Sequence, residues 1–289
     1  MSDFTPDWLS LRESADAAAR SADVAAEVSG RMAGRDCVRV LDLATGTGAN
    51  LRCLAPQLPS PQRWLVVDRD VDLLAHVSRR VSSWALSRAC TVAGDPAGFV
   101  LRGPAFECRV ETRHADLSKL TDGALFQGRD LVTASALLDL VSEAWLRTLI
   151  GYCATARVPM LFALTYDGRM TCTPEDPDDE LIRHLVNRHQ RRAKGFGRAL
   201  GPDAIEVAVR GLDENGYAWR RENSDWRLTP AQGTLQRQLV EGWALAAMEM
   251  DRKAADHVAA WKSRRLALIE EGKSEALVGH TDLAAWPGA

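Results

Sequence analysis

The chain has 289 residues, of which 46% are hydrophobic and 26% charged, and its net charge is −3. This length accommodates one large domain or a domain with a cap, and the composition is that of an ordinary folded protein. The weak negative charge disfavours proteins that bind nucleic acid by neutralising many phosphates. The start of the chain lacks a basic segment followed by an apolar core, and the longest apolar stretch contains Asp139 and Glu143. We therefore expect no signal peptide and no membrane span, and we predict a cytoplasmic monomer or homodimer.

The first half of the chain alternates short apolar runs with amphipathic segments. From Trp8 to about Met32 the sequence is Ala-rich, with charges three and four apart, and predicts one helix, so we expect residues 1–34 to form a helical cover. The predicted strands are residues 37–44, 63–70, 105–117, 129–138 and 158–166, and the predicted helices are 50–58, 71–86 and 142–154. Residues 87–103 fit neither pattern. Strands separated by helices of this length indicate an α/β fold with a doubly wound, mostly parallel sheet.

The second half is richer in helices. Helical patterns occupy much of 173–201, then 202–216, 234–250 and 254–271, and strand patterns cover 217–228 and 275–286. Because the last two strands complete a seven-stranded sheet, we expect a single domain over 1–289. Residues 170–201 and 229–273 are then helical cap insertions.

A glycine-spaced turn follows the first predicted strand. The dinucleotide fingerprint requires a third glycine, and Leu51 stands in its place after Gly46 and Gly48. The phosphate-loop lysine is absent as well. Asp68 ends the next predicted strand, where a carboxylate can accept both hydroxyl protons of a ribose. The pattern therefore favours a nucleoside ligand over a pyrophosphate.

At these residues the sequence resembles the class I S-adenosyl-L-methionine-dependent methyltransferases, over roughly residues 36–166. "DLATGTG" matches the first family motif, [D/E]-x-G-x-G-x-G, with Ala44 at the first glycine, and "DLVTASALLDL" (130–140) resembles the fourth. The resemblance implies that the first turn contacts the methionine part of S-adenosyl-L-methionine, that Asp68 holds the ribose, and that Asp116 and Leu117 lie at the adenine. The cofactor-binding residues so implied are Asp42, Ala44, Thr45, Gly46, Gly48, Asp68, Arg69, Asp116, Leu117, Ser135 and Arg20. Arg20 belongs to the cover, and the alternative for it is a surface pair with Glu13 or Asp16.

The first cap insertion carries the candidate acceptor site. Five acids precede six Lys or Arg residues between 175 and 198, which the helix dipole alone can explain. Alternatively, the apolar stripe of this helix continues onto His189 and Arg192, which would then face the body of the protein. On this interpretation the catalytic residues are His189 and Tyr166, and the substrate-binding residues are Arg169, Arg192 and Lys194. His184 and His189 diverge on the helix, and the six cysteines form no CxxC motif, so we expect no metal and only reduced thiols.

The predicted function is methyl transfer from S-adenosyl-L-methionine to an oxygen or nitrogen of a small molecule. Anionic small molecules are among the candidate acceptors. The [N/D/S]PP[Y/F] tetrapeptide of many nucleic-acid and protein methyltransferases is absent, and no nucleic-acid partner is expected. One alternative is an rRNA or protein methyltransferase that docks through residues 183–198. The others are a non-catalytic cofactor-binding regulatory module and a nicotinamide-dependent oxidoreductase.

Overall fold

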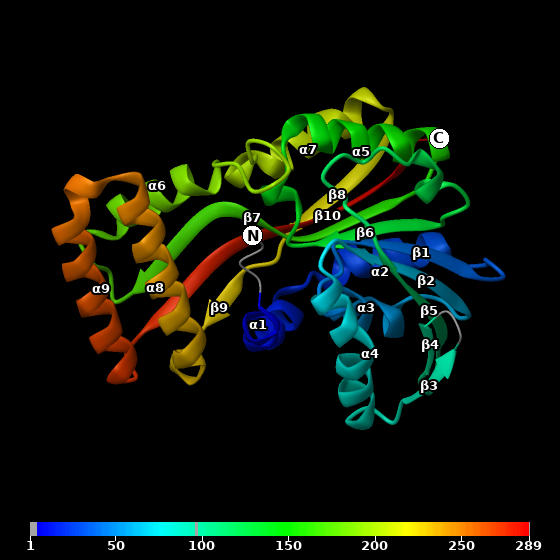
Figure 1. The fold of residues 1–289 in the computed structure, drawn as a ribbon, viewed down its shortest axis with the longest axis horizontal. Coiled ribbons are helices and arrows are strands. Elements are labelled where there is room, and N and C mark those ends of the chain that lie inside the picture. The colour runs from blue at the N-terminus through cyan, green and yellow to red at the C-terminus, as the bar shows by residue number, and fades with distance from the viewer. Residues whose placement is uncertain (1–4, 96–97, 289) are drawn as a thin grey trace.

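The computed structural model describes residues 5–95 and 98–288, and its centre is one mixed sheet of ten strands (Figure 1). The strands run in the order β3-β4-β5-β2-β1-β6-β7-β10-β8, and β9 pairs with β10 beside this path. Their bounds are β1 Val38–Leu43, β2 Gln62–Asp68, β3 Thr91–Asp95, β4 Gly98–Arg102, β5 Glu107–His114, β6 Leu131–Ser135, β7 Met160–Thr173, β8 Tyr217–Asn223, β9 Trp226–Leu228 and β10 Glu275–Pro287. The parallel centre, β5-β2-β1-β6-β7, confirms the predicted doubly wound sheet.

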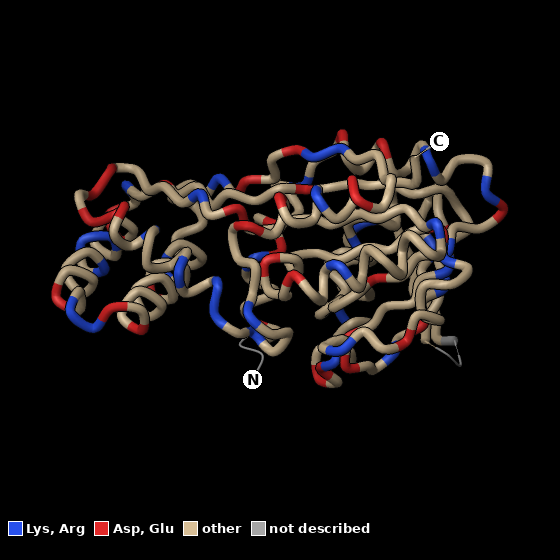
Figure 2. Tube along the Cα trace, turned by 90° about the horizontal axis from the view of Figure 1, so that it is seen from above, with Lys and Arg blue, Asp and Glu red and all other residues tan. Residues whose placement is uncertain are grey.

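Helices cover both faces of this sheet, as a parallel sheet requires. The helices are α1 Pro6–Ala19, α2 Ala22–Met32, α3 Ala49–Leu54, α4 Val71–Leu86, α5 Glu143–Ala156, α6 Asp179–Gln190, α7 Ala204–Glu214, α8 Gly233–Met250 and α9 Ala255–Glu270. One apolar core joins α5 and α7 to the sheet, and a second joins α2, α3 and α4 to its other face. Acidic and basic residues are both spread over the described trace (Figure 2). None of the described helices is long and apolar enough to cross a membrane.

The prediction of seven strands was wrong, because three further strands join the sheet. Two of them, β3 and β4, form an antiparallel hairpin on the edge strand β5, within the segment 87–103 that fitted neither pattern. Positions 96 and 97 of that segment lie outside the described residues. The third, β9, arises because the predicted strand 217–228 is interrupted at Ser224 and Asp225, whose carboxylate pairs with Arg169 of β7.

The predicted N-terminal helix is two helices, and residues 1–4 of the predicted cover lie outside the described part. α1 ends at Ala19, and the hydroxyl of Ser21 caps α2 by accepting a hydrogen bond from the amide of Val24 at 3.2 Å. The amide of Ser21 donates to Asp282 of β10 at 3.0 Å. A polar contact with the last strand therefore interrupts a segment whose composition is helical throughout.

β7 is longer than the predicted strand 158–166 and runs on to Thr173. It pairs with β10 from Met160 opposite Ala285 to Thr173 opposite Glu275. The two strands leave the sheet as a long ribbon, and α6, α8 and α9 pack on its far end (Figure 1). A strand thus occupies the start of the predicted cap insertion 170–201, because β10 continues to supply hydrogen bonds to it.

Candidate cofactor and active site

The turn after β1 uses three residues in the left-handed region. The φ angles are +52° at Ala44, +56° at Gly46 and +80° at Gly48. A Cβ atom on Gly46 would lie 3.3 Å from Leu9 of α1, and one on Gly48 would lie 3.1 Å from Val77 of α4. Glycine is favoured at 46 and 48 both by backbone conformation and by close packing, whereas Ala44 adopts a conformation that costs an L-residue about 1–2 kcal/mol.

A buried network of side-chain hydrogen bonds supports this turn. The carboxylate of Asp42 accepts hydrogen bonds from the Thr45 hydroxyl at 2.6 Å and from Asn50 Nδ2 at 2.7 Å. Asn50 Oδ1 in turn accepts a bond from Arg20 Nη1 at 3.0 Å, so Arg20 reaches the turn itself. Burial raises the pKa of Asp42 to about 6, although the bonds from Thr45 and Asn50 oppose this shift.

Asp68, at the end of β2, ties the next strand to the same turn. Its Oδ2 accepts a hydrogen bond from the backbone amide of Gly46 at 2.8 Å, and its Oδ1 accepts one from the amide of Asp70 at 3.0 Å. Only 7% of Asp68 is exposed. The acid and the glycine turn therefore form one rigid unit at the carboxyl ends of β1 and β2.

The same unusual backbone recurs just after β6 and within β7, where the pairing of these two strands stops at Ser135 and Ala163. Ala136 and Leu164 both have φ angles of +53°, and neither is glycine. The amide of Leu164 donates to Oδ1 of Asp282 at 2.8 Å, and Oδ2 of Asp282 lies 3.5 Å from Arg20 Nε. Together with Ala44, these residues place a sparsely populated backbone conformation on three adjacent strands, just after β1 and β6 and within β7. Such conformations cluster at ligand sites.

A groove of about 730 Å³ borders this edge between α1 and α3. Its lining includes Arg20, Asn50, Ser135 and Leu164. A volume of this size suits a nucleoside-sized ligand. The groove thus brings together Arg20 and Ser135, which the sequence had assigned to one cofactor site.

Arg69 and the segment after β5 meet a turn of the first cap insertion. The Arg69 guanidinium lies 5.7 Å from the ring centre of Phe196, and the Phe196 ring meets Trp145 edge-on at 5.5 Å. Trp145 Nε1 donates to the carbonyl of Leu117 at 2.6 Å, and the Leu117 side chain is buried in the core.

Asp116 differs from the other strand-end acids because it is exposed to solvent. It accepts hydrogen bonds at 2.9 Å from the amide and the hydroxyl of Ser118, and these bonds lower the pKa of Asp116.

Tyr166 lies just past Leu164 on β7 and is largely buried. Its hydroxyl donates to Asn187 Oδ1 at 2.8 Å, and its ring lies 6.2 Å from that of His280. Burial raises the pKa of Tyr166, so its hydroxyl keeps its proton at neutral pH.

The other predicted catalytic and acceptor residues are engaged by partners within the chain. His189 Nε2 lies 3.3 Å from Glu249 of α8, and Arg192 pairs with the same carboxylate at 2.5 Å. Arg169 binds both Asp167 and Asp225, at 2.5 and 2.6 Å. His189 and Arg192 therefore lie at a contact between α6 and α8, away from the residues that line the groove.

Lys194 occupies a turn closed by pairing of Ala193 with Arg198. Burial raises the pKa of Asp139, the next-to-last residue of the fourth-motif segment, and the positive charge of Lys194 opposes this shift.

Asn50, Asp139, Asp282 and Phe196 were not predicted as site residues. An acid inside an apolar run, as at Asp139, was a signal in the sequence, whereas the contacts of Asp282 and Phe196 depend on long-range packing. Among the described residues, no cluster of three or more His, Cys, Asp or Glu side chains could hold a metal ion.

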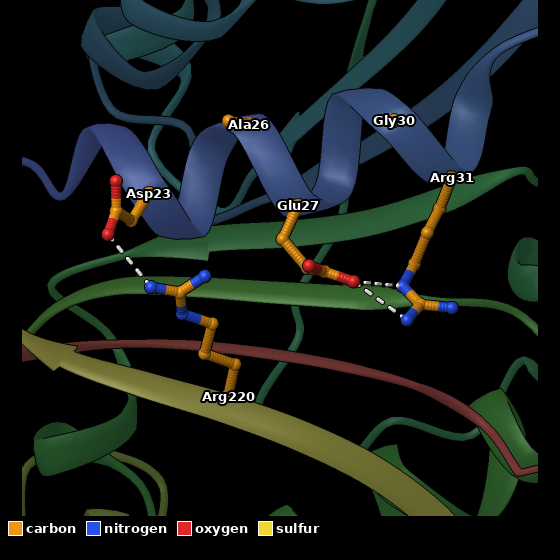
Figure 3. Close-up of a pocket in the computed structure, with 6 residues that line it drawn as sticks. All are labelled: Asp23, Ala26, Glu27, Gly30, Arg31 and Arg220. Atoms are coloured by element: carbon orange, nitrogen blue, oxygen red, sulfur yellow. Dashed lines mark hydrogen bonds and ion pairs between the residues drawn. The ribbon is translucent and has the colours of Figure 1, made fainter.

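A second hollow lies on the surface between α2 and β8 (Figure 3). Its charged residues pair with one another, since Arg220 binds Asp23 at 2.8 Å and Arg31 binds Glu27 at 2.7 Å. The Arg31 guanidinium also lies 3.5 Å from the ring centre of Trp286. These contacts stabilise the α2 face of the sheet.

Comparisons with known proteins identify the fold through structure and not through sequence. No family model matches the chain, and no curated protein matches it in sequence. A candidate methyltransferase of Bacillus halodurans is 14% identical, with 93% of this chain and 100% of that chain covered and a TM-score of 0.51. A cyclopropane synthase of Mycobacterium tuberculosis is 11% identical, with 98% and 95% covered and a TM-score of 0.49. The likeness to the Bacillus halodurans protein shows that the chain has a Rossmann-like methyltransferase fold.

Proposed function

We propose that the protein is an S-adenosyl-L-methionine-dependent methyltransferase. The observation that carries this proposal is the hydrogen bond between the glycine turn and Asp68, at 2.8 Å, beside a groove at the carboxyl ends of β1 and β6. The sheet order reverses at this point, which is where open α/β sheets bind their ligands. The likeness in fold to the Bacillus halodurans protein supports the same conclusion.

The residues present fit this cofactor. The backbone of Ala44, Thr45, Gly46 and Gly48 would hold the methionine part, above the buried carboxylate of Asp42. Asp68 would accept the two ribose hydroxyls with the lone pairs that its two backbone bonds leave free.

The two ends of the cofactor would meet different parts of this edge. Arg69, Asp116 and Leu117 would lie at the adenine end. Arg20, positioned by Asn50 and Asp282, would meet the carboxylate, and Ser135 would lie between cofactor and acceptor.

The bound cofactor supplies a methyl group on a positively charged sulfur. The chain needs to align a nucleophile with that methyl group and to exclude water, because in-line displacement gains most from orientation. The left-handed residues after β1 and β6 and within β7 support that role, since they fix the backbone around the reacting centre.

The acceptor is proposed to be a small molecule methylated on oxygen or nitrogen, anionic molecules included. The basic segment 183–198 supports this choice over docking of RNA or protein, because three of its arginines already bind acids of the chain. These pairs are Arg183 with Glu180, Arg191 with Asp203 and Arg192 with Glu249.

Five sequence-based assignments stay predictions. They are His189 and Tyr166 in catalysis, and Arg169, Arg192 and Lys194 at the acceptor. Tyr166 has the best support, because it follows Leu164, which lines the groove. The cytoplasmic location, the monomeric or dimeric state and the cap insertions stay predictions as well.

Calorimetry with S-adenosyl-L-methionine, S-adenosylhomocysteine and NAD tests the cofactor. We expect micromolar binding of the first two and none of NAD, and binding of NAD alone would overturn the proposal. Incubation of a metabolite extract with methyl-labelled cofactor, followed by mass spectrometry, then tests transfer and identifies the acceptor.

A further inference from the structure

Asp139 is a buried carboxylate with one oxygen that nothing in the described chain engages. It lies in the short 3-10 turn Leu138–Leu140, which follows the carboxyl end of β6. Only 8% of Asp139 is exposed, and its Oδ1 is buried without a hydrogen-bond partner among the described residues. An unpaired polar atom in such a place costs free energy unless a ligand completes it.

The other buried aspartates make this exception clear. In each of them, both carboxylate oxygens accept hydrogen bonds from the chain. They are Asp42, Asp68, Asp130 and Asp282. Among the buried aspartates in the described part of the chain, Asp139 is therefore the one with a carboxylate oxygen that accepts no hydrogen bond.

Groups from three other parts of the chain act on the Asp139 carboxyl: α1, β7 and the turn that carries Lys194. Backbone amides of Asp139 itself and of Tyr166 bond to its carboxyl, and positive charges approach from Arg12 of α1 and from Lys194. Burial outweighs these effects and raises the pKa of Asp139 to about 6, so the carboxylate is ionised at neutral pH and can take up a proton.

A second unpartnered atom belongs to a side chain that packs against Tyr166. Nδ1 of His280 on β10 is buried without a hydrogen-bond partner among the described residues, and 6% of His280 is exposed. Its ring packs against Tyr166 at 6.2 Å and against Trp226 at 5.1 Å. Burial lowers the pKa of His280 to about 3, so this ring stays neutral. Two incomplete polar groups thus contact Tyr166: Asp139 through the Tyr166 backbone amide, and His280 through its ring.

We propose that Asp139 is the catalytic residue that receives the proton of the methyl acceptor, and that the acceptor therefore presents an O–H or N–H to Oδ1. This inference rests on the proposed transferase function and names its substrate class. The acceptor atom forms a bond to the methyl carbon, and the carbon–sulfur bond breaks with its electron pair moving to sulfur. The proton of the acceptor passes to Oδ1 of Asp139 and then to solvent, so the charge of the sulfonium is balanced by loss of the carboxylate charge.

Access to the enclosed Oδ1 requires a covering segment to move. The turn that carries Lys194 contains Gly195 and Gly197, whose φ angles of +94° and +87° suit glycine alone. The same turn pairs Phe196 with Val141, two residues after Asp139. We assign the movement to this turn, because its Lys194 acts on the Asp139 carboxyl and its Phe196 pairs two residues away.

Asp139→Asn tests the inference, because the amide keeps the shape and can still accept the bond from the Tyr166 amide. The control is Asp130→Asn at the opposite end of β6, a buried aspartate bonded to Arg35 and to the amide of Arg39. Calorimetry with S-adenosylhomocysteine should give affinities within threefold of wild type for both variants.

With the acceptor identified from the labelled extract, Asp139→Asn should lower kcat at least 100-fold, the scale of general-base catalysis, and Asp130→Asn should not. Wild-type kcat should rise through one ionisation near the pKa of about 6, and the variant should lack this limb. NMR of protein labelled with ¹³C in the aspartate carboxyl groups gives a direct readout. The Asp139 resonance is assigned as the one that the spectrum of Asp139→Asn lacks. In the wild-type complex with S-adenosylhomocysteine, this resonance should shift when the acceptor is added.

Different results would overturn the proposed transferase function and the proposed role of Asp139. A wild-type chain that does not bind S-adenosylhomocysteine overturns the proposed function, and one that binds it but labels nothing overturns both proposals. Normal turnover in Asp139→Asn, a label on carbon, or an Asp139 resonance indifferent to the acceptor overturns the inference alone.

Discussion

The backbone amide of Gly46 donates a 2.8 Å hydrogen bond to Oδ2 of Asp68, and this bond joins the ends of β1 and β2. The glycine turn and the acid are separate signals in the sequence, and the fold makes them one structural unit. A ligand that binds one of them is therefore held at a defined position relative to the other.

Asp68→Ala should weaken binding of S-adenosylhomocysteine at least tenfold, because it removes a charged acceptor whose hydrogen bonds contribute about 1.5–3 kcal/mol each. It also frees the Gly46 amide and loosens the turn. Calorimetry measures the affinity, and Asp70→Ala, which leaves this carboxylate in place, is the control. An unchanged affinity in Asp68→Ala would mean that another residue holds the ribose.

Ala44→Gly should raise the free energy of unfolding by about 1 kcal/mol, because alanine is held at a φ of +52° in this turn. Ala89 has the same φ in the turn after α4, so Ala89→Gly should give a similar gain. Only Ala44→Gly should alter cofactor affinity. Urea unfolding with and without S-adenosylhomocysteine measures both effects, and an equal ligand response in the two variants would contradict a role for Ala44 at the cofactor.

Asp139 should make the protein less stable as pH rises from about 4 to 6. The folded chain holds the Asp139 proton up to a pKa of about 6, against roughly 4 when unfolded, so ionisation costs about 3 kcal/mol of folding free energy above that window. Asp139→Asn should therefore be more stable than wild type at pH 7.5 and similar to it near pH 4.

Asp42 titrates over the same range in wild type and in Asp139→Asn, so the difference between the two proteins isolates Asp139. Thermal unfolding across this pH range is the measurement. A difference that stays constant with pH would show that the carboxyl is not perturbed.

His189→Gln separates the sequence-based assignment of His189 as the base from the assignment of Asp139. With Asp139 as the base, His189→Gln should change kcat by less than threefold and the free energy of unfolding by less than about 1 kcal/mol. His189 lies 3.3 Å from Glu249, which Arg192 binds more closely, and exposed ion pairs contribute little. Burial and the charge of Lys194 also lower the pKa of His189. Arg192→Gln is the matched variant on the same carboxylate. A 100-fold loss of turnover in His189→Gln alone would support the sequence-based assignment of His189 as the base.

Local patterns in the sequence determined the alternation of strands and helices, the left-handed glycine turn and the acid at the end of the next strand. These features were predictable because residues close in sequence create them: Gly46 and Gly48 meet backbone requirements of their own turn. The doubly wound fold follows from them, since alternating apolar strands and helices have few other ways to bury both faces of a sheet.

Tertiary structure decided the rest. β7 extends to Thr173 because β10, more than 100 residues later, pairs with it along its whole length, and Asp225 interrupts a predicted strand because it binds Arg169. His189 faces Glu249, and Asp139 keeps an unpaired oxygen, for reasons that lie in distant segments. Hydrogen bonds and ion pairs between such segments depend on chain packing, which the pattern of any one segment does not contain.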